Sequence, residues 1–445
     1  MTVATRVLLL YLVVTYVPQS VLALIIPDEY ATEYRGYDQD VWLKIAFMVI
    51  IAALIVLLQA GLRQAFSGFG RFGLIRFVRS FPLSASRAAL QSTQLGLSIP
   101  FALVYGISFF HAGLYLSELP AWVLILQAIK PLARLDLAYC VIKALRGDRL
   151  SKFDRAMVLT NCVASAVSIA GAIDILFVVL GATLLVKRGT VLRQIFVRPA
   201  AHVKSGRVRS ALYVMLISAS LPAVAFLGFA NKLGIERTLD LFEDTATLTL
   251  RFIVPLALRL SSSHGSFVAN AELPLSLSEQ LESVSYPLGN LAWRACIIAI
   301  REPCPQRGDI THTARLNYVR SYQDQSPLKA GATPGLLATV LYVPIFPLAL
   351  LLTACYCALV AGCIQSALGC VRLNLVGHFL VVLFVFPAYE NPLDLVIIFD
   401  PAVVYTLGFL LVLRSFASGA IRAVKIDGVQ LAAVPRSWKL RNVVG

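Results

Sequence analysis

Several residues that could bind phosphate and sugar groups lie close together in the polar stretch 309–322. On a helix, the histidine and the first arginine of this stretch lie one turn apart, and its two tyrosines form an i, i+4 pair. Arginine binds phosphate through two parallel hydrogen bonds, and aromatic rings suit the C–H face of sugars. The stretch predicts a phosphate and glycan site, or alternatively surface salt bridges to Asp309 and Asp324. The candidate site residues are His312, Arg315, Tyr318, Arg320 and Tyr322.

A second candidate group lies earlier, in the apolar stretch 245–260. It contains Arg251 and Arg259, which are eight residues apart and so share one face of a helix, with Pro255 as a kink between them. We expect an interfacial or re-entrant helix that aims both guanidinium groups at one site. His264 follows shortly after and titrates in a range that is useful for catalysis.

Proton transfer has more than one candidate in this part of the chain. His264 or His312 could act as a general base, and either could instead be a hydrogen-bonding residue. A carboxylate such as Glu272 or Glu282 could also take the proton. The choice stays open at the level of the sequence.

Cofactor and metal chemistry find no support in the sequence. There is no Walker-type loop and no His-Glu-X-X-His motif, and the cysteine spacing indicates no metal site. We expect no cofactor and no metal. Cys296 and Cys304 bracket seven residues and could form a disulfide outside the membrane, or remain two buried thiols.

The amino-acid composition indicates the fold class. Of 445 residues, 58% are hydrophobic and 14% are charged, whereas about one quarter of the residues of a soluble domain are charged. The apolar runs are continuous rather than alternating, which favours helices over a membrane β-barrel. We therefore expect an all-α, polytopic integral membrane protein with about ten transmembrane helices.

Ten apolar segments could form these helices. The least regular case is 156–186, where a long apolar run separates two basic loops. We expect a hairpin of two short helices there, turning near residues 171–174. The predicted spans are 6–26, 42–62, 95–116, 119–145, the two halves of 156–186, 211–230, 336–362, 375–387 and 397–413.

The distribution of charge predicts the orientation in the membrane. The short loops 27–41 and 388–400 carry eight acidic residues and one basic residue, whereas the loops on the other side are rich in lysine and arginine. Because basic loops stay in the cytoplasm, we expect both termini inside and the segment 229–335 outside. The net charge of +15 then indicates contact with anionic lipid head groups and not with nucleic acid.

Three regions follow from this layout. The N-terminal transmembrane helices occupy 1–228, a large and partly helical periplasmic loop occupies 229–335, and C-terminal helices with a basic cytoplasmic tail occupy 336–445. If the stretches 245–260 and 288–300 also cross the membrane, twelve spans keep the same orientation.

One stretch of the outer loop resembles a known family. Arg320, ten intervening residues and Gly331 are followed by Ala332-Thr333-Pro334-Gly335 at the entry to a span. This pattern resembles the Arg-X10-Gly motif of bacterial O-antigen and oligosaccharide repeat-unit polymerases of the Wzy type. The layout of many spans, one large periplasmic loop late in the chain and inside termini is also similar to theirs. The motif covers residues 320–335 and the layout covers the whole chain.

The resemblance implies a glycosyltransferase of lipopolysaccharide or exopolysaccharide biosynthesis in the bacterial inner membrane. It would transfer a growing glycan from one undecaprenyl pyrophosphate carrier to another lipid-linked repeat unit at the periplasmic face. Its partners would be these lipid-linked oligosaccharides and the bilayer, with a chain-length regulator and a flippase. Preorganised arginines would stabilise the charge on the departing pyrophosphate. The expected ligands of pyrophosphate and glycan are Arg251, Arg259, Arg315, Arg320, Tyr318 and Tyr322.

Two other activities fit the same residues. An O-antigen ligase uses the same donor but transfers the glycan to lipid A–core oligosaccharide. A lipid-linked oligosaccharide flippase or another transporter is favoured by the ionisable residues Lys130, Arg134, Asp136 and Asp174 inside predicted spans, although Asp136 could simply neutralise one of the cations. The absence of an internal repeat weighs against transport.

Overall fold

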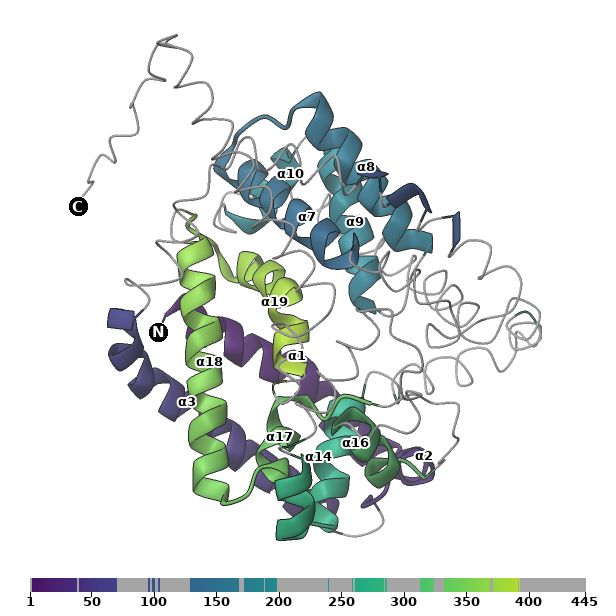
Figure 1. Cartoon of the computed structure of the whole chain (residues 1–445), viewed down its shortest axis with the longest axis vertical. Coiled ribbons are helices and arrows are strands. Elements are labelled where there is room, and N and C mark those ends of the chain that lie inside the picture. The colour runs from purple at the N-terminus through teal and green to yellow at the C-terminus, as the bar shows by residue number, and fades with distance from the viewer. Residues whose placement is uncertain are drawn as a thin grey trace, which may run out of the picture.

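Helices and short turns make up the described part of the chain in the computed structural model (Figure 1). Among the described residues there is no strand, and the β-type contact found there is an isolated antiparallel bridge between Tyr34 and Tyr322. The prediction of a helical fold is confirmed at this level. The structure describes residues 2–37, 40–69, 95–96, 98–100, 103–104, 129–167, 172–187, 189–197, 239, 258, 261–283, 285, 313–323, 332–368, 371–390 and 392.

Long apolar helices form the centre of the molecule. α1 (Val3–Ile25), α3 (Val41–Phe69), α18 (Phe346–Leu368) and α19 (Leu375–Glu390) pack with the shorter α17 (Gly335–Tyr342). Their apolar side chains meet in one cluster, which brings the two ends of the described chain together. Its buried residues include Leu8, Tyr11, Ile51, Ile55, Leu336 and Tyr389.

Two of these helices are long and apolar enough to cross a membrane. They are α1 and the part of α3 from Val41 to Leu62, and they coincide with the first two predicted spans. Only 39% and 22% of their most apolar windows are buried, whereas a core helix of a soluble protein is mostly buried. Large apolar side chains such as Val17 on α1 and Leu57 on α3 face outward. The structure therefore contains two candidate membrane-spanning helices in its described part.

The predicted span 336–362 is wrong in one respect, because it consists of two helices. The break between α17 and α18 falls at Val343, which has φ −100° and ψ 133°. The ring of Pro344 excludes helical backbone from the residue before it, which accounts for this extended conformation. Ile345 then adopts a positive φ of 64° and redirects the chain into α18.

A second group of helices lies at one end of the molecule (Figure 1). It contains α7 (Ile129–Arg146), α8 (Lys152–Val167), α9 (Ala172–Lys187) and α10 (Thr190–Phe196). α8 and α9 have 16 residues each and pack closely against one another. Two helices are therefore present in 156–186 as predicted, but the turn predicted near 171–174 is misplaced, because α9 already begins at Ala172. That both helices cross the membrane stays a prediction.

The remaining predicted spans have mixed outcomes. α7 agrees with the later part of 119–145, and α19 includes all of 375–387. The spans predicted at 95–116, 211–230 and 397–413 lie wholly or mainly outside the described residues. The total of ten spans stays a prediction.

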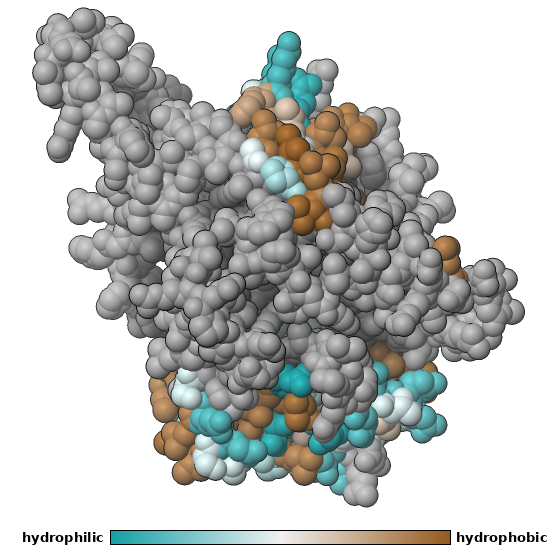
Figure 2. Space-filling model, turned by 45° about the vertical axis from the view of Figure 1, so that its right-hand side comes forward, coloured by the Kyte–Doolittle hydropathy of each residue, from teal (hydrophilic) through white to brown (hydrophobic). Residues whose placement is uncertain are grey.

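Three shorter helices lie together at the opposite end from α10 (Figure 1). They are α2 (Pro27–Glu33), α14 (Ser262–Glu272) and α16 (Thr313–Ser321). The first acidic loop and the large polar segment, which the charge pattern placed on one side of the membrane, are therefore in contact. Figure 2 shows polar and apolar side chains mixed on the surface of this end. At the other end, the N–H of Asn374 donates to the carbonyl of Phe196 at 3.1 Å and ties α19 to α10.

Candidate functional site

Small residues on α14 let other elements approach its backbone. A Cβ atom added to Gly265 would lie 2.4 Å from Cδ1 of Tyr34, so that ring packs directly on the helix backbone. Ser266 donates its hydroxyl proton to the carbonyl of Ser262 one turn earlier, at 2.6 Å. The polar residues of α14 are thus held within a crowded, buried environment.

His264 lies in α14 and is fully buried. Its Nδ1 lies 2.5 Å from the hydroxyl of Tyr37, and its Nε2 lies 3.1 Å from the hydroxyl of Ser20. Because Ser20 donates its own proton to the carbonyl of Tyr16 at 2.9 Å, Nε2 donates to Ser20 and Nδ1 accepts from Tyr37. Burial lowers the pKa of His264 from 6.5 to about 3.

The sequence allows His264 to be a general base or a hydrogen-bonding residue, and the geometry supports the second role. A general base needs a ring nitrogen within reach of the substrate and a pKa near the working pH. Both ring nitrogens of His264 are occupied by protein groups, and the side chain has no solvent exposure. The neutral imidazole therefore joins α1, α14 and the turn after α2.

Five tyrosines from α2, the turn after it and the end of α16 form a buried aromatic cluster. Tyr318 and Tyr322 stack with ring centroids 4.7 Å apart and planes at 26°, which is the pairing that the sequence predicted. Tyr34 lies 4.7 Å from Tyr322 on a tilted plane. The ring centroids of Tyr30 and Tyr37 are 5.0 Å apart. Tyr318 is 2% exposed and Tyr322 is 8% exposed, so both rings contact protein rather than solvent.

The hydroxyl groups of this cluster also have partners. Tyr30 donates to Oε1 of Gln19 at 2.7 Å and lies 2.8 Å from the hydroxyl of Ser261, which donates to the same oxygen. Tyr34 donates to the carbonyl of Leu258 at 2.5 Å. Burial raises the pKa of the Tyr34 phenol well above its usual value, so it stays protonated. The cluster is therefore closed by hydrogen bonds as well as by ring contacts.

A network of side-chain amides joins α14, α16 and α17. Oδ1 of Asn317 accepts from the hydroxyls of Tyr342 at 2.8 Å and Ser321 at 3.0 Å, and its Nδ2 donates to Ser266 at 2.7 Å. Nδ2 of Asn270 donates to the Tyr342 hydroxyl at 3.0 Å. Fully paired buried networks of this kind hold helices in one relative position.

Asn270 also holds the arginine of the Arg-X10-Gly pattern. Arg320 donates from Nε to Oδ1 of Asn270 at 3.2 Å, from Nη1 to Oε1 of Glu279 at 3.1 Å, and from Nη2 to the carbonyl of Leu273. These contacts use three of the five N–H groups that a guanidinium carries. Hydrogen bonds from Ser276 lower the pKa of Glu279, which favours a charged carboxylate opposite Arg320. The guanidinium plane is therefore fixed from several directions.

Of the other predicted site residues, Arg315 lies in the described part of the chain and several lie outside it. Arg315 places its guanidinium carbon 5.8 Å from the ring centroid of Tyr318. The salt bridge seen for Arg320 is made with Glu279, whereas the predicted alternative named two aspartates. Predicted residues that lie outside the described part of the chain are Arg251, Arg259, Cys296, Cys304, Asp309, His312 and Asp324.

Gly331, the glycine of the pattern, lies outside the described residues, whereas Gly335 four residues later starts α17. Gly335 has φ +78°, and a Cβ atom there would lie 2.5 Å from the side chain of Ser263 and 2.9 Å from the hydroxyl of Tyr16. The Tyr16 hydroxyl accepts a hydrogen bond from the N–H of Leu337 at 3.2 Å. Only glycine combines this backbone angle with this space, so Gly335 lets α17 start in contact with α1 and α14.

Sequence reasoning missed several residues that hold the site together. Gln19 and Ser20 lie in an apolar span, where a polar residue is itself a signal of a buried partner. Asn270 and Asn317 carried no such signal, because their side chains meet across 47 residues of sequence. Glu279 stands in a polar segment among other acidic residues, and only its place beside Arg320 distinguishes it.

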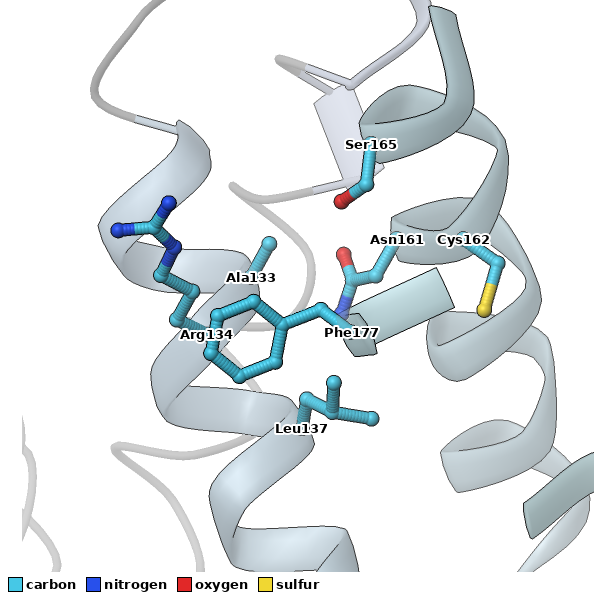
Figure 3. Close-up of a pocket in the computed structure, with 7 residues that line it drawn as sticks. All are labelled: Ala133, Arg134, Leu137, Asn161, Cys162, Ser165 and Phe177. Carbon is cyan, nitrogen blue, oxygen red and sulfur yellow. The ribbon is translucent and has the colours of Figure 1, made fainter. Parts of the chain in front are cut away.

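A second polar group lies between α7, α8 and α9. Figure 3 shows Asn161 and Ser165 projecting from α8 toward α7, with Phe177 of α9 between the helices. The guanidinium carbon of Arg134 lies 5.3 Å from the Phe177 ring centroid. The recess that these side chains line has a volume of about 10 Å³, which is the room that one water molecule needs. It is too small for a sugar or a lipid head group.

No protein family, curated protein or solved structure matches the chain. The class of this protein is therefore defined by its fold and its candidate site. It is a mostly helical protein with two candidate membrane-spanning helices and a buried polar and aromatic site at one end. Within the part of the chain that the structure describes, no three His, Cys, Asp or Glu side chains are grouped to hold a metal ion.

Proposed function

We propose that this protein is a membrane glycosyltransferase that polymerises undecaprenyl-pyrophosphate-linked oligosaccharide repeat units into O-antigen or exopolysaccharide. The observation that carries the proposal is the fixed position of Arg320, whose guanidinium group is held by Asn270, Glu279 and the carbonyl of Leu273. A cation that is oriented before the substrate binds needs no reorganisation when charge develops in the transition state. Arg320 also lies in the segment that resembles the polymerases.

A location in the bacterial inner membrane is supported by the outward-facing apolar surfaces of α1 and α3. In the proposed topology ten spans cross the membrane and both termini are cytoplasmic. The end that carries α2, α14 and α16 then faces the periplasm, where the acidic loop 27–41 belongs by the positive-inside rule. The end that carries α10 faces the cytoplasm.

The proposed reaction joins one glycan to another without a cofactor. A hydroxyl oxygen of the acceptor repeat unit attacks the anomeric carbon of the donor, and the bond from that carbon to the pyrophosphate oxygen breaks. Undecaprenyl pyrophosphate leaves with the bonding electrons, so negative charge grows on its phosphate oxygens. Arg315 and Arg320 are proposed to bind it, together with Arg251 and Arg259 from the predicted interfacial helix.

The acceptor proton requires a base other than His264, because that imidazole is buried with both nitrogens occupied. Glu272 is paired with Lys44 in a salt bridge. His312 and the exposed Glu282 are the remaining predicted candidates. Replacing each of these two residues separately would distinguish them through the pH dependence of the rate.

The test is reconstitution of the purified protein in lipid with a short undecaprenyl-pyrophosphate-linked repeat unit. We expect a ladder of products on a gel without any added nucleotide sugar. If no ladder forms with folded, membrane-inserted protein, the polymerase proposal is wrong. Addition of lipid A–core oligosaccharide to the same vesicles tests for a ligase, which would give transfer to that acceptor instead.

A transporter is the second candidate, and one observation favours it. Asp136 is 3% exposed within α7, a helix that also carries Arg134, and buried charges inside spans often mark transport pathways. The recess beside Arg134 has a volume of about 10 Å³, which does not hold a lipid-linked sugar. Movement of the substrate to the opposite leaflet without any ladder would favour the flippase.

A further inference from the structure

Three leucines are exposed at the end of the molecule that carries Arg320. Leu277 and Leu281 lie in the helical segment 277–283, and Leu273 precedes this segment by four residues. The three residues are 52%, 62% and 58% exposed in chain order. Because residues four apart share one face of a helix, the second and third leucine form a continuous apolar side. We call the three residues the leucine surface.

Hydrogen bonds hold the segment 277–283 with its leucines outward. The N–H of Ser276 donates to the carboxylate of Glu279 at 2.8 Å, and the N–H of Glu279 donates to the Ser276 hydroxyl at 3.3 Å. This reciprocal pair is a capping box that starts the helix. On its inner side, the hydroxyl of Ser283 donates to the carbonyl of Tyr342 at 2.7 Å. The outward position of the leucines is therefore fixed by the packing of the segment against α17.

The two sides of this segment differ in polarity. On a helix with 3.6 residues per turn, Leu277 and Leu281 lie on one side, whereas Glu279 and Glu282 lie toward the other. Glu279 is paired with Arg320, and Glu282 is exposed. A helix with one apolar side and one charged side lies in the plane of a membrane interface, with its apolar side toward the acyl chains. The segment has this pattern.

The leucine surface lies next to the start of a candidate membrane-spanning helix. α3 begins at Val41, and Lys44 in its first turn forms a salt bridge with Glu272, directly before Leu273. Trp42 in the same turn is 71% exposed, and tryptophan is enriched where helices leave the membrane. The leucines therefore lie at the level at which α3 meets the lipid head groups. This continuity with the apolar surface of α3 favours lipid over a protein partner.

We propose that the leucine surface contacts the membrane, which seats residues 273–283 in the lipid head-group region and places Arg320 at the depth of the lipid phosphates. Arg320 is tied to this surface, because Nη2 donates to the carbonyl of Leu273 and Nη1 donates to Glu279. An anionic group then reaches the guanidinium along the membrane surface, so the site selects a phosphate that is attached to a lipid. This selection rests on the proposed function, whereas the membrane contact does not.

The first experiment measures the contact with lipid directly. An environment-sensitive fluorescent amino acid replaces Leu277 in the full chain, which is reconstituted in phosphatidylcholine vesicles. Leu57, exposed on α3, is the lipid-facing control, and Thr32, exposed on α2, is the water-facing control. We expect phospholipids brominated near the head group to quench the probe at position 277. Iodide in the water should quench it several-fold less than at position 32.

Two outcomes of this experiment would overturn the membrane contact. Iodide that quenches the probe at position 277 as strongly as at position 32 would show that the leucines face water. A probe at position 277 that neither iodide nor brominated lipid quenches would show that protein covers them.

The second experiment connects the leucine surface with Arg320. Leu277→Gln/Leu281→Gln makes two exposed side chains polar, so the unfolding temperature in detergent should stay that of the wild type. Because burial of one leucine side chain is worth about a tenfold change in affinity, we expect the KM for the short lipid-linked repeat unit to rise about tenfold. The kcat should change little, since Arg320 keeps its hydrogen bonds. Ser278→Gln, at an exposed position of the same segment, is the matched control and should keep the wild-type KM.

Failure of the membrane contact and failure of the proposed function give different results. If the wild type forms a ladder and iodide reaches position 277 freely, the polymerase stands and the membrane contact is wrong. If lipid quenches position 277 but the wild type forms no ladder, the contact stands and the selection of a lipid-linked phosphate falls with the proposed function. A wild-type KM in the double variant would show that the contact does not serve substrate binding.

Discussion

The end of the molecule built from α14, α16 and α17 and the group of α7, α8 and α9 hold their polar residues in different ways. At the first end, Asn270 and Asn317 connect three helices through short hydrogen bonds and fix Arg320. In the second group, Arg134 lies over an aromatic ring beside a recess of about 10 Å³. Polar side chains thus form a connected network in one region and border tight apolar packing in the other.

This difference indicates which region is suited to a charged ligand. A guanidinium group that is already oriented loses little entropy when it binds an anion, whereas a recess of about 10 Å³ would first have to widen. The Arg320 end also carries the stacked tyrosines Tyr318 and Tyr322. We therefore expect the functional site at that end and a packing role for the helices α7 to α9, and the following predictions test this expectation.

The largest effect is expected for Arg320→Ala. Removing one preorganised charge partner of a transition state costs about 100-fold to 1,000-fold in rate, so the ladder should nearly vanish. Arg320→Lys should restore little, because a point charge cannot replace the planar fork. Arg149→Ala, at an exposed basic site between α7 and α8, is the matched control. Initial rates of ladder formation measure the effect, and wild-type rates for Arg320→Ala would remove it from the site.

The next effect concerns the stability of the amide network. Asn317→Ala leaves the hydroxyls of Tyr342 and Ser266 without this partner. Each buried polar group that loses its hydrogen bond costs about 1–3 kcal/mol, so thermal unfolding should occur at a clearly lower temperature. Thr160→Ala, where the exposed hydroxyl bonds only to its own helix, is the control. Equal unfolding temperatures for the two variants would show that the network contributes nothing.

A smaller effect is expected in the other region. A Cβ atom at residue 181 would lie 2.3 Å from Sγ of Cys162, so Gly181→Ala overpacks the contact between α8 and α9 and should cost about 1–3 kcal/mol. The double change with Cys162→Ala should recover most of this loss. Ladder formation should be unchanged, and a selective loss of activity in the folded variant would argue against a purely structural role.

The smallest effect is a pH dependence of stability. The pKa of His264 is about 3 in the folded protein, whereas an ordinary histidine has a pKa of 6.5. Between these two pH values the unfolded state therefore binds more protons than the folded state. Stability contributed by neutral His264 is therefore present above pH 6.5 and falls as the pH drops toward 3. Between pH 6.5 and 5.5 the loss is about 1 kcal/mol. Unfolding of the wild type and of His264→Gln at both pH values checks this, and equal slopes would contradict it.

Local sequence patterns determined much of the helical structure. Continuous apolar runs predicted α1, α3 and the hairpin of α8 and α9, because a helix of apolar residues satisfies its own backbone. The spacing of Tyr318 and Tyr322 predicted that they lie next to one another on one helix face, since residues four apart share a face. The break between α17 and α18 could also have been read from Pro344, whose ring acts on the residue directly before it.

Tertiary structure alone decided what these residues meet. Burial keeps the imidazole of His264 neutral, and Ser20, which lies 244 residues away in sequence, occupies its Nε2. Arg320 is oriented by Asn270 across 50 residues, and Tyr322 is covered by Tyr34 across 288 residues. Helix formation depends on neighbours within a turn, whereas burial, tautomer and ion pairing depend on which helices pack together. The candidate residues could therefore be predicted from the sequence, but their contacts and protonation states could be assigned only from the folded chain.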